Sequence, residues 1–350
     1  MLELSNRIIS LIESSRVRVA NYANSAMVFT YFEVGKLIIE EFQNGEERAK
    51  YGDNLLNSIS IDLKSKGLKG FSVQNLERMR NFYLTYSNSS NELRNSGLFQ
   101  KSSTLLRISE KDEKTIKILP LSWSHYLFLL RIENELERQF YEVESFSNHW
   151  TLKELERQYN SGLFERIALS KNKEEIKKLV SEGQLIENSK DIFKEPYVLE
   201  FLGLQEKEIY SETDFETAII NEIEKFMLEL GKGFFFGGRQ VRFTFDEDHY
   251  RVDLVFYNRL LQCFVLIDLK IGKLTHQDIG QMQMYVNYYD RFIKSETENK
   301  TIGIILCKDK KQTIVEITLP ENNTQIFASK YQTILPSKDA FKNLLNEYDS

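Results

Sequence analysis

Charged residues lie within or directly after two mainly apolar segments in the second half of the chain. The segment Tyr250–Tyr257 has the alternating pattern of a strand, with the apolar residues Val252, Leu254 and Phe256 on one face. Asp253 lies on the other face, in the middle of this predicted strand. The segment Cys263–Ile267 is continuously apolar, as is typical of a strand covered on both faces, and Asp268 and Lys270 follow it. Because residues two apart in a strand share a face, Asp268 and Lys270 are expected to point to the same side of the sheet.

Acidic side chains at the end of a core strand need a cation, because an unpaired buried carboxylate is costly. Two carboxylates and an ammonium group that converge on one spot would suit a divalent metal ion and a bound water. The spacing itself, Asp253 and then Asp268-Leu269-Lys270 after fourteen intervening residues, is a weak pattern, because many strands end in an acid and a lysine. A structural Asp–Lys ion pair inside a core is the alternative explanation.

Two predicted helices flank this segment. The downstream helix begins with a capping pattern at Thr275 and Asp278, and it places Gln281 and Tyr285 one turn apart beside its apolar stripe. The upstream helix runs to about residue 231, and Glu216 falls inside its apolar face. This glutamate could belong to the same site, or it could simply favour the helix dipole as an acid of the first turn.

Composition limits the classes of protein to which the chain can belong. Its 350 residues suffice for two or three domains, and a hydrophobic fraction of 41% with 24 Phe and 17 Tyr provides ample core. Cys263 and Cys307 lie in predicted buried strands, and no Cys-x-x-Cys pattern occurs, which favours a reduced compartment over a disulfide framework. No two histidines are spaced four residues apart, so no zinc site is predicted.

The beginning of the chain lacks the pattern of a signal peptide, and no stretch approaches the roughly 18 apolar residues of a membrane span. We therefore expect a cytoplasmic protein with no membrane partner. The net charge of −6 neither supports nor excludes nucleic-acid binding, because binding needs a local basic face and a metal site adds carboxylates of its own.

The first half of the chain is predicted to be helical. Residues 1–45 favour two helices and residues 51–63 a third. Ser72 is a suitable N-cap for a fourth helix, and Gly67 and Gly70 mark a break before it. Two helices joined by a glycine turn have the outline of a helix-turn-helix, for which an ordinary helical hairpin is the alternative.

This predicted turn also carries a local excess of positive charge. Between residues 61 and 82, five basic side chains accompany two acids, Asp62 and Glu77, which gives a net charge of +3. The segment could therefore bind nucleic acid, or its charges could merely be solvated. The side chains that could contact bases or phosphates are Lys69, Gln74, Asn75, Arg78 and Arg80.

Beyond these helices the composition marks a division of the chain. Residues 87–118 lack periodicity and favour a loop, whereas residues 121–144 favour one long helix. The charged stretch 171–195 contains a glycine and leads towards a proline, which is typical of a linker. We therefore expect a helical domain over residues 1–170 and a second domain over residues 196–350.

The second domain is predicted to combine strands and helices. Its expected order is a helix that ends at about residue 231, three strands, a helix and a strand. The segments Val315–Leu319 and Gln325–Ala328 would add edge strands. The predicted fold class is therefore α+β with two domains, an all-α N-terminal domain followed by an α/β domain in the order αβββαβ.

Segments in both halves resemble the YhcG-like nuclease family of bacteria. In the helical half they are YFEVGKLI, RAKYGDNLLNSIS, GFSVQNLERMRNFY and LSWSHYLFLLRI. In the second half they are FFFGGRQVRF, VDLVFYNRLLQCFVLIDLK, GQMQMYVNYYDR and TIGIILCKDK. In that family a helical domain precedes a PD-(D/E)xK nuclease domain of restriction-endonuclease-like fold, and the resemblance covers nearly the whole chain.

The nuclease motif of that family occurs here with two departures. Asp253 with Asp268-Leu269-Lys270 is similar to the PD-(D/E)xK pattern, but Val252 stands where a proline is usual. Asp268 stands where the family commonly has glutamate. Because aspartate is one methylene shorter, a metal would have to lie closer to the strand or bind through a water.

The resemblance implies a metal-dependent nuclease that acts on nucleic acid, with DNA favoured over RNA. The ligands of Mg²⁺ or Mn²⁺ would be Asp253, Asp268 and the carbonyl group of Leu269, and Glu216 would join directly or through water. Lys270 would orient the attacking water and offset the charge that develops on the phosphate.

Other residues would support this reaction. Gln281 and Tyr285 resemble the Q-x-x-x-Y element of the Mrr-like branch of these nucleases and would position the water or the lysine. Arg239, Gln240 and Arg242 lie on the preceding strand, near enough to contact phosphate. The alternative is a non-catalytic nucleic-acid-binding or protein-interaction module with a decayed site, and the helical domain could also join two copies of the chain.

Overall fold

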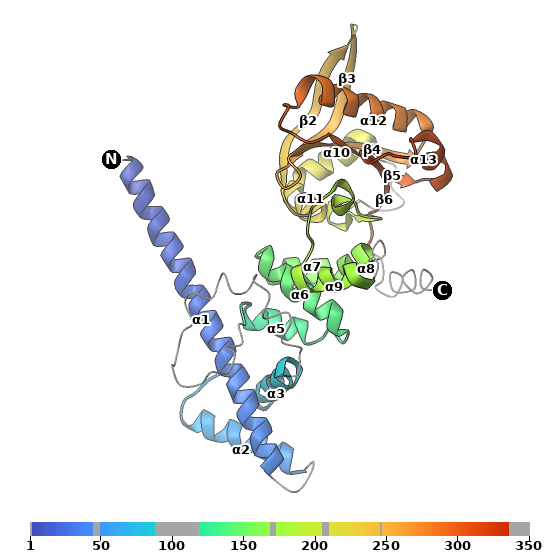
Figure 1. The fold of residues 1–350 in the computed structure, drawn as a ribbon. Coiled ribbons are helices and arrows are strands. Elements are labelled where there is room, and N and C mark those ends of the chain that lie inside the picture. The colour runs from blue at the N-terminus through green and yellow to red at the C-terminus, as the bar shows by residue number, and fades with distance from the viewer. Residues whose placement is uncertain are drawn as a thin grey trace. The chain divides into compact units, whose positions relative to one another are not determined.

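A computed structural model describes residues 2–44, 50–87, 119–168, 173–204, 210–245 and 247–335 of the chain (Figure 1). The chain divides into two compact units. The first comprises residues 1–156 with 177–183, and the second comprises residues 157–176 with 184–350. The division falls inside the helices α7 (Leu152–Asn160) and α9 (Lys173–Glu182), so part of the stretch expected to be a linker is helical.

The first unit is organised around one long helix. The helix α1 (Leu2–Asn44) is continuous over 43 residues, so the prediction of two helices in this stretch is wrong. The stretch contains no proline, and its one glycine, Gly35, lies against α3 (Val73–Ser87). A Cβ atom at Gly35 would lie 2.1 Å from the carbonyl oxygen of Met79, so this glycine permits close packing of α1 on α3 instead of ending the helix.

The stretch predicted as one long helix, residues 121–144, holds two helices, α5 (Trp123–Leu129) and α6 (Glu135–Ser147). Asn134 separates them, because its side chain accepts a hydrogen bond from the Glu137 N–H at 3.0 Å and caps α6. The unit also contains α2 (Lys50–Ser65), and buried aromatic rings of α1, α3 and α5 pack together. These rings are Phe32, Phe82 and Tyr126.

The second unit contains a six-stranded mixed sheet in the order β1-β6-β5-β4-β3-β2. Neighbouring strands from β2 to β4 are antiparallel, whereas those from β4 through β5 and β6 to β1 are parallel. The strands are β1 (Tyr197–Val198), β2 (Phe234–Phe245), β3 (Asp248–Asn258), β4 (Cys263–Lys273), β5 (Ile302–Asp309) and β6 (Ile326–Gln332).

Helices cover both faces of this sheet (Figure 1). The helices α10 (Glu212–Asn221) and α11 (Ile223–Leu230) share one hydrophobic core with one face of the central strands. The helix α12 (His276–Tyr288) shares a second core with the other face. The order α10, β2, β3, β4, α12 and β5 confirms the predicted αβββαβ arrangement and, with the helical first unit, the predicted fold class.

Local details of the second unit differ from the prediction. The helix expected to reach residue 231 is divided at Glu222, where φ is −116° and ψ is 32°. The expected edge strand Val315–Leu319 falls largely in α13 (Gln312–Thr318), because Val315 packs into the core beside α12 and tertiary packing overrides strand propensity. The short helices are α8 (Leu163–Ala168), the 3₁₀ helices Ser189–Ile192 and Glu200–Leu202, and the π-helix Tyr289–Ile293.

Candidate active site

The candidate site lies where β3 and β4 separate. The two strands pair as far as Leu254, which lies opposite Ile267, and Asp253 and Asp268 are the next residues on each strand. The backbone N–H of Leu269 donates to Asp253 Oδ2 at 2.8 Å. This carboxylate therefore ties the two strands together at the point where their ladder of hydrogen bonds ends.

Asp268 and Lys270 form a largely buried ion pair beside Asp253. Asp268 is 2% exposed, and its Oδ2 lies 2.9 Å from Lys270 Nζ. Burial, and then the charge of Asp253, raise the pKa of Asp268 to about 7, although Lys270 acts in the opposite direction. Burial alone would lower the pKa of Lys270, but Asp268 outweighs it and the pKa is raised. The site therefore has a surplus of negative charge that a bound cation would relieve.

The side chain of Gln240 links Glu216 to Asp253. Glu216 lies on α10 and is 3% exposed. The Gln240 amide donates to Asp253 Oδ1 at 3.0 Å and also to Glu216 Oε2. Arg239 Nε lies 2.9 Å from Glu216 Oε1. Glu216 is therefore a buried member of this cluster.

The backbone at Gln240 explains why two consecutive residues reach the same carboxylate. In a regular strand, Arg239 and Gln240 would point to opposite faces of the sheet. Gln240 has a φ of 47°, in the left-handed region that residues other than glycine adopt infrequently. Such a conformation has to be stabilised by its surroundings, and it occurs preferentially at functional sites.

The carboxylates of this cluster are the kind of ligand that a hard cation prefers, but they do not form a complete metal-binding group. In the described part of the chain, no three His, Cys, Asp or Glu side chains gather closely enough to hold a metal ion. Asp268 Oδ2 and Glu216 Oε1 are buried and accept no well-aligned hydrogen bond, even though each faces a basic nitrogen at 2.9 Å. Buried carboxylate oxygens with unfilled acceptor positions are the ligands that Mg²⁺ prefers. Asp268 and Glu216 satisfy this requirement, whereas both carboxylate oxygens of Asp253 accept hydrogen bonds, from Gln240 and from the Leu269 N–H. Metal ligation by the three acids stays a prediction.

Gln281 and Tyr285 lie one turn apart on α12, as predicted, and they contact one another. The Gln281 amide donates to the Tyr285 hydroxyl group. Tyr285 is 1% exposed, and burial raises its pKa to about 12, with the negative charges of Asp268 and Asp253 contributing. The phenol therefore stays protonated at neutral pH, and it lies close enough to Asp268 and Asp253 for their negative charges to raise its pKa.

One residue of the site was missed by sequence reasoning. Asp278 accepts from Thr275 N–H at 2.8 Å, as the predicted capping pattern requires, but its other carboxylate oxygen also lies 3.9 Å from Lys270 Nζ. The short connection between β4 and α12 is what brings the cap of the helix near the lysine. Asp278 thereby adds a second acid near Lys270.

Comparison with known proteins covers both halves of the chain. Residues 190–346 match the model of the YhcG PDDEXK nuclease domain, and residues 7–166 match that of the DUF1016 N-terminal domain. A protein of Escherichia coli (strain K12) named "Putative nuclease YhcG" is 38% identical over 344 residues, which are 96% of this chain and 91% of that protein. The chain belongs to the YhcG family. The resemblance found in the sequence is thereby confirmed.

A solved structure gives a weaker match to this YhcG-family chain. It is the crystal structure of a repair endonuclease from Pyrococcus abyssi, with 18% identity and a TM-score of 0.24 over 37% of this chain and 50% of that one. A likeness at that level supports no conclusion about function. In the ranges that the structure describes, no helix is long and apolar enough to cross a membrane.

The residues predicted to bind nucleic acid in the helical unit have different surroundings. Lys69, Gln74 and Arg78 are exposed. Asn75 donates from its side chain to the carbonyl oxygen of Gly70, within the turn between α2 and α3. The three exposed side chains are therefore the ones available to a ligand, while Asn75 supports the turn.

Arg80 has a structural role that separates it from Arg78. Its guanidinium group lies over the ring of Phe42, 5.5 Å from the ring centre, and its Nε is buried. If this surface binds DNA, Arg78→Ala should weaken binding and leave stability unchanged, whereas Arg80→Ala should lower the free energy of unfolding by about 1 kcal/mol. Electrophoretic mobility shifts and denaturant titrations would measure the two effects, and unchanged shifts for both variants would contradict DNA binding here.

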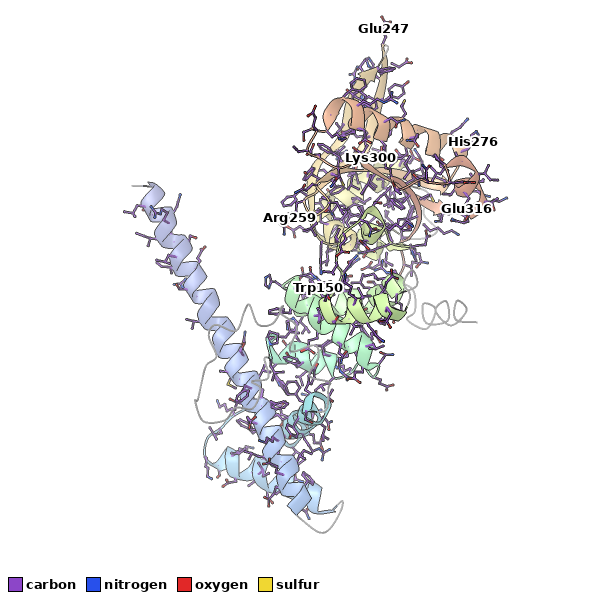
Figure 2. All side chains as sticks on the ribbon, viewed as in Figure 1. Trp150, Glu247, Arg259, His276, Lys300 and Glu316 are labelled. Carbon is purple, nitrogen blue, oxygen red and sulfur yellow. The ribbon has the colours of Figure 1, made fainter. Side chains whose placement is uncertain are left out.

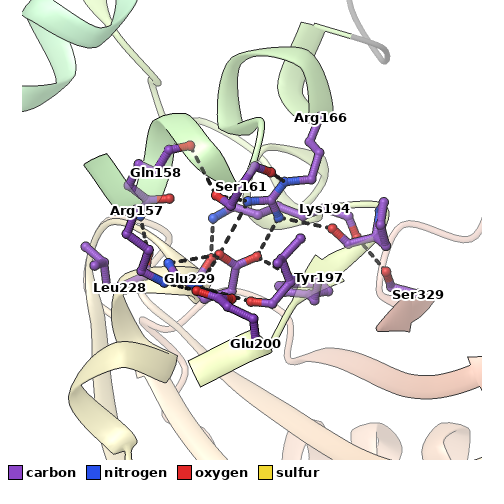
Figure 3. A network of polar contacts seen from close by, with 12 residues as sticks. Arg157, Gln158, Ser161, Arg166, Lys194, Tyr197, Glu200, Leu228, Glu229 and Ser329 are labelled. Atoms are coloured by element: carbon purple, nitrogen blue, oxygen red, sulfur yellow. Dashed lines mark hydrogen bonds and ion pairs between the residues drawn. The ribbon is translucent and has the colours of Figure 1, made fainter. Parts of the chain in front are cut away.

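A buried ionic network inside the second unit surrounds Glu229 of α11 (Figure 3). Glu229 is 0% exposed, and it forms ion pairs with Arg166 and, at 3.4 Å, with Arg157. The N–H of Val198 in β1 donates to Glu229 Oε1 at 3.0 Å, and Lys194 donates to the Glu229 carbonyl oxygen. The network joins residues 157–168 to the helix and strand of the nuclease-type domain.

The negative charge of Glu229 is compensated by cations that are close to it in space but distant from it in the sequence. Burial by itself would raise the pKa of Glu229, but Arg166, Lys194 and Arg157 outweigh it and hold the pKa at about 2. Arg157 also pairs with the partly buried Glu200 at 2.9 Å. No local pattern in the sequence indicated this cluster, because its members lie in residues 157–166, in residues 194–200 and at Glu229.

Proposed function

We propose that this protein hydrolyses phosphodiester bonds of nucleic acid in a metal-dependent reaction, with DNA as the expected substrate. The observation that supports this most is the meeting of Asp253, Asp268 and Lys270 where β3 and β4 separate. A purely structural Asp–Lys pair would gain nothing from a second carboxylate beside it, because the second charge raises the cost of burying the first.

The residues that would hold Mg²⁺ or Mn²⁺ are Asp253, Asp268 and the carbonyl group of Leu269. Such an ion, when bound, polarises the phosphate and lowers the pKa of a water. Glu216 would contribute through Gln240, whose amide contacts both Glu216 and Asp253. Without the Gln240 amide, the carboxylates of Glu216 and Asp253 would lose the donor that they share, and their negative charges would repel one another.

Lys270 would act as a fixed positive charge. Because its pKa is raised, the ammonium group stays protonated at neutral pH and is unsuited to accept a proton from water. A protonated amine held beside Asp268 can donate to a phosphate oxygen and stabilise the negative charge that develops during attack. Its role is therefore electrostatic.

Tyr285 and Gln281 would position these groups. With a pKa of about 12, the Tyr285 hydroxyl group keeps its proton, and the Gln281 amide orients it. The protonated phenol can donate a hydrogen bond towards a substrate oxygen or a water near the acids.

The direct test is cleavage of linear, branched and single-stranded DNA, and of RNA of the same sequence, in Mg²⁺ or Mn²⁺ and in EDTA. We expect at least one of these substrates to be cut in the presence of a metal and none in EDTA. Intact substrates in every metal-containing reaction would contradict the proposal.

A second candidate function is a non-catalytic nucleic-acid-binding module. Its support is the engagement of Glu216 by Arg239 and Gln240, which leaves this acid outside a complete metal-binding group. Calorimetric titration with Mn²⁺ separates the two functions. The nuclease proposal expects a heat of binding that Asp253→Asn removes, and a titration that is silent for the unmodified protein would favour the second candidate.

A further inference from the structure

Beyond the point where β3 leaves β4, it continues as a two-stranded ribbon with β2 (Figure 1). The ribbon comprises residues 239–245 and 248–253, and Glu247 lies in the turn at its tip (Figure 2). In this register Arg242 lies directly opposite Arg251. The arginine pair is two residues further along each strand than the position at which Gln240 meets Asp253.

The register places both arginines on the same face of the ribbon as Asp253. Val241, Phe243, Tyr250 and Val252 belong to the core under α12, and the ring of Phe243 lies 4.0 Å from that of Tyr288. Because side chains alternate along a strand, the other face carries the intervening residues. These are Arg242 and Thr244 on β2, with His249 and Arg251 on β3. Asp253 follows Arg251 on this side, where Gln240 links it to Glu216 of α10.

Among the residues that the structure describes, neither arginine has an acid as its ion-pair partner. Both are exposed, and within the described residues neither guanidinium group forms an ion pair. Like charges directly opposite one another in a sheet destabilise it. The Thr244 hydroxyl and His249 Nδ1 lie 2.9 Å apart as the next pair along this face, which adds no negative charge. An anion bound between the arginines would turn a repulsive pair into an attractive one.

Residues two apart on one strand face are separated by about 7 Å, so Arg251 and Asp253 lie about that far apart along β3. Two guanidinium groups provide planar sets of N–H donors that match the oxygens of a phosphate. We propose that Arg242 and Arg251 bind the backbone phosphate of a nucleic acid next to the one that is cleaved, a role that rests on the proposed nuclease function. The pair then sets which phosphate reaches the acids, without contact to a base.

The test measures binding without cleavage. The full chain is titrated in EDTA with fluorescent duplex DNA, and separately with duplex RNA of the same sequence, at several salt concentrations. Arg242→Ala and Arg251→Ala are each expected to weaken binding about tenfold near 0.1 M salt and to lower the salt slope by about 1, because each removes one phosphate contact. The duplex that shows these losses is the ligand. Arg259→Ala is the matched control, since Arg259 is exposed at the opposite end of β3 (Figure 2).

Thermal unfolding adds a second expectation. Because the pair is repulsive without a ligand, Arg251→Thr should leave the melting temperature unchanged or raise it, while binding falls. Binding and salt slope unchanged in both alanine variants, or lowered equally by Arg259→Ala, would overturn the proposal. Cleavage assays keep the two hypotheses apart. Metal-dependent cutting with unaffected binding in the variants would overturn the arginine pair alone. Affected binding without any cutting would overturn the nuclease function and leave the arginines as a phosphate-binding pair that is not tied to cleavage.

Discussion

Replacing Asp253 with asparagine should lower the rate of nucleic-acid cleavage at least about a thousandfold, equivalent to about 4 kcal/mol in the activation barrier. Asparagine keeps the size of the side chain and one oxygen that can accept from the Leu269 N–H. It removes the negative charge that, with Asp268, would attract a divalent cation. Lys270→Met should cause a loss of similar size, because it removes the positive charge beside the phosphate while retaining most of the length of the side chain.

The control for these variants is Asp248→Asn, which removes an exposed acid from the same strand. We expect it to cleave like the unmodified protein. Initial rates under excess substrate, together with circular dichroism spectra, would separate lost chemistry from lost folding. Full cleavage by correctly folded Asp253→Asn and Lys270→Met proteins would refute the roles assigned to both residues.

Replacing Glu229 with glutamine should lower the free energy of unfolding by about 3–5 kcal/mol, because it leaves buried cations without their counter-charge. Arg166 is 3% exposed and has its ion pair with Glu229, so its charge would stay buried and uncompensated. Lys194, which is 2% exposed, would lose the same charge nearby. Urea titration followed by circular dichroism would measure the loss.

The contribution of Glu229 to the free energy of unfolding should also depend on pH. The folded protein holds the pKa of Glu229 at about 2, below its ordinary value of 4.5. A lowered pKa means that the ionised form is stabilised by folding, so this contribution is complete above about pH 4.5 and is lost as the pH falls towards 2. The Glu229→Gln variant should lack this part of the acid dependence.

A matched control is Glu200→Gln, in the same network. The Glu200 side chain is 20% exposed and pairs with Arg157, so its loss should cost no more than about 1 kcal/mol. Equal, small effects of the two substitutions would contradict the importance of the buried charge. A large effect of Glu229→Gln alone would show that residues 157–168 are held to the nuclease-type domain chiefly through one carboxylate.

Several features of the site could be predicted because they depend on local periodicity. Alternation in β3 placed Asp253 among core residues, and the apolar run of β4 placed Asp268 and Lys270 at its end. The helical spacing of Gln281 and Tyr285 likewise placed them one turn apart on the same flank of α12, where they form a hydrogen bond. Errors arose where a neighbour overrode local preference, as at Gly35, which supports close helix packing and does not end the helix.

The sequence by itself determined the family, the αβββαβ order at the core of the second domain, and the positions of the acids and lysine along their strands. The tertiary structure alone decided that β3 separates from β4 just where the acids stand, that Gln240 joins Glu216 to Asp253, and that Arg242 faces Arg251. The reason is physical: periods of two and 3.6 residues are fixed by the backbone and are visible in any short segment. Strand register, left-handed backbone and contacts such as Arg157 with Glu229, 72 residues apart, depend on how distant segments pack, and no short segment records that.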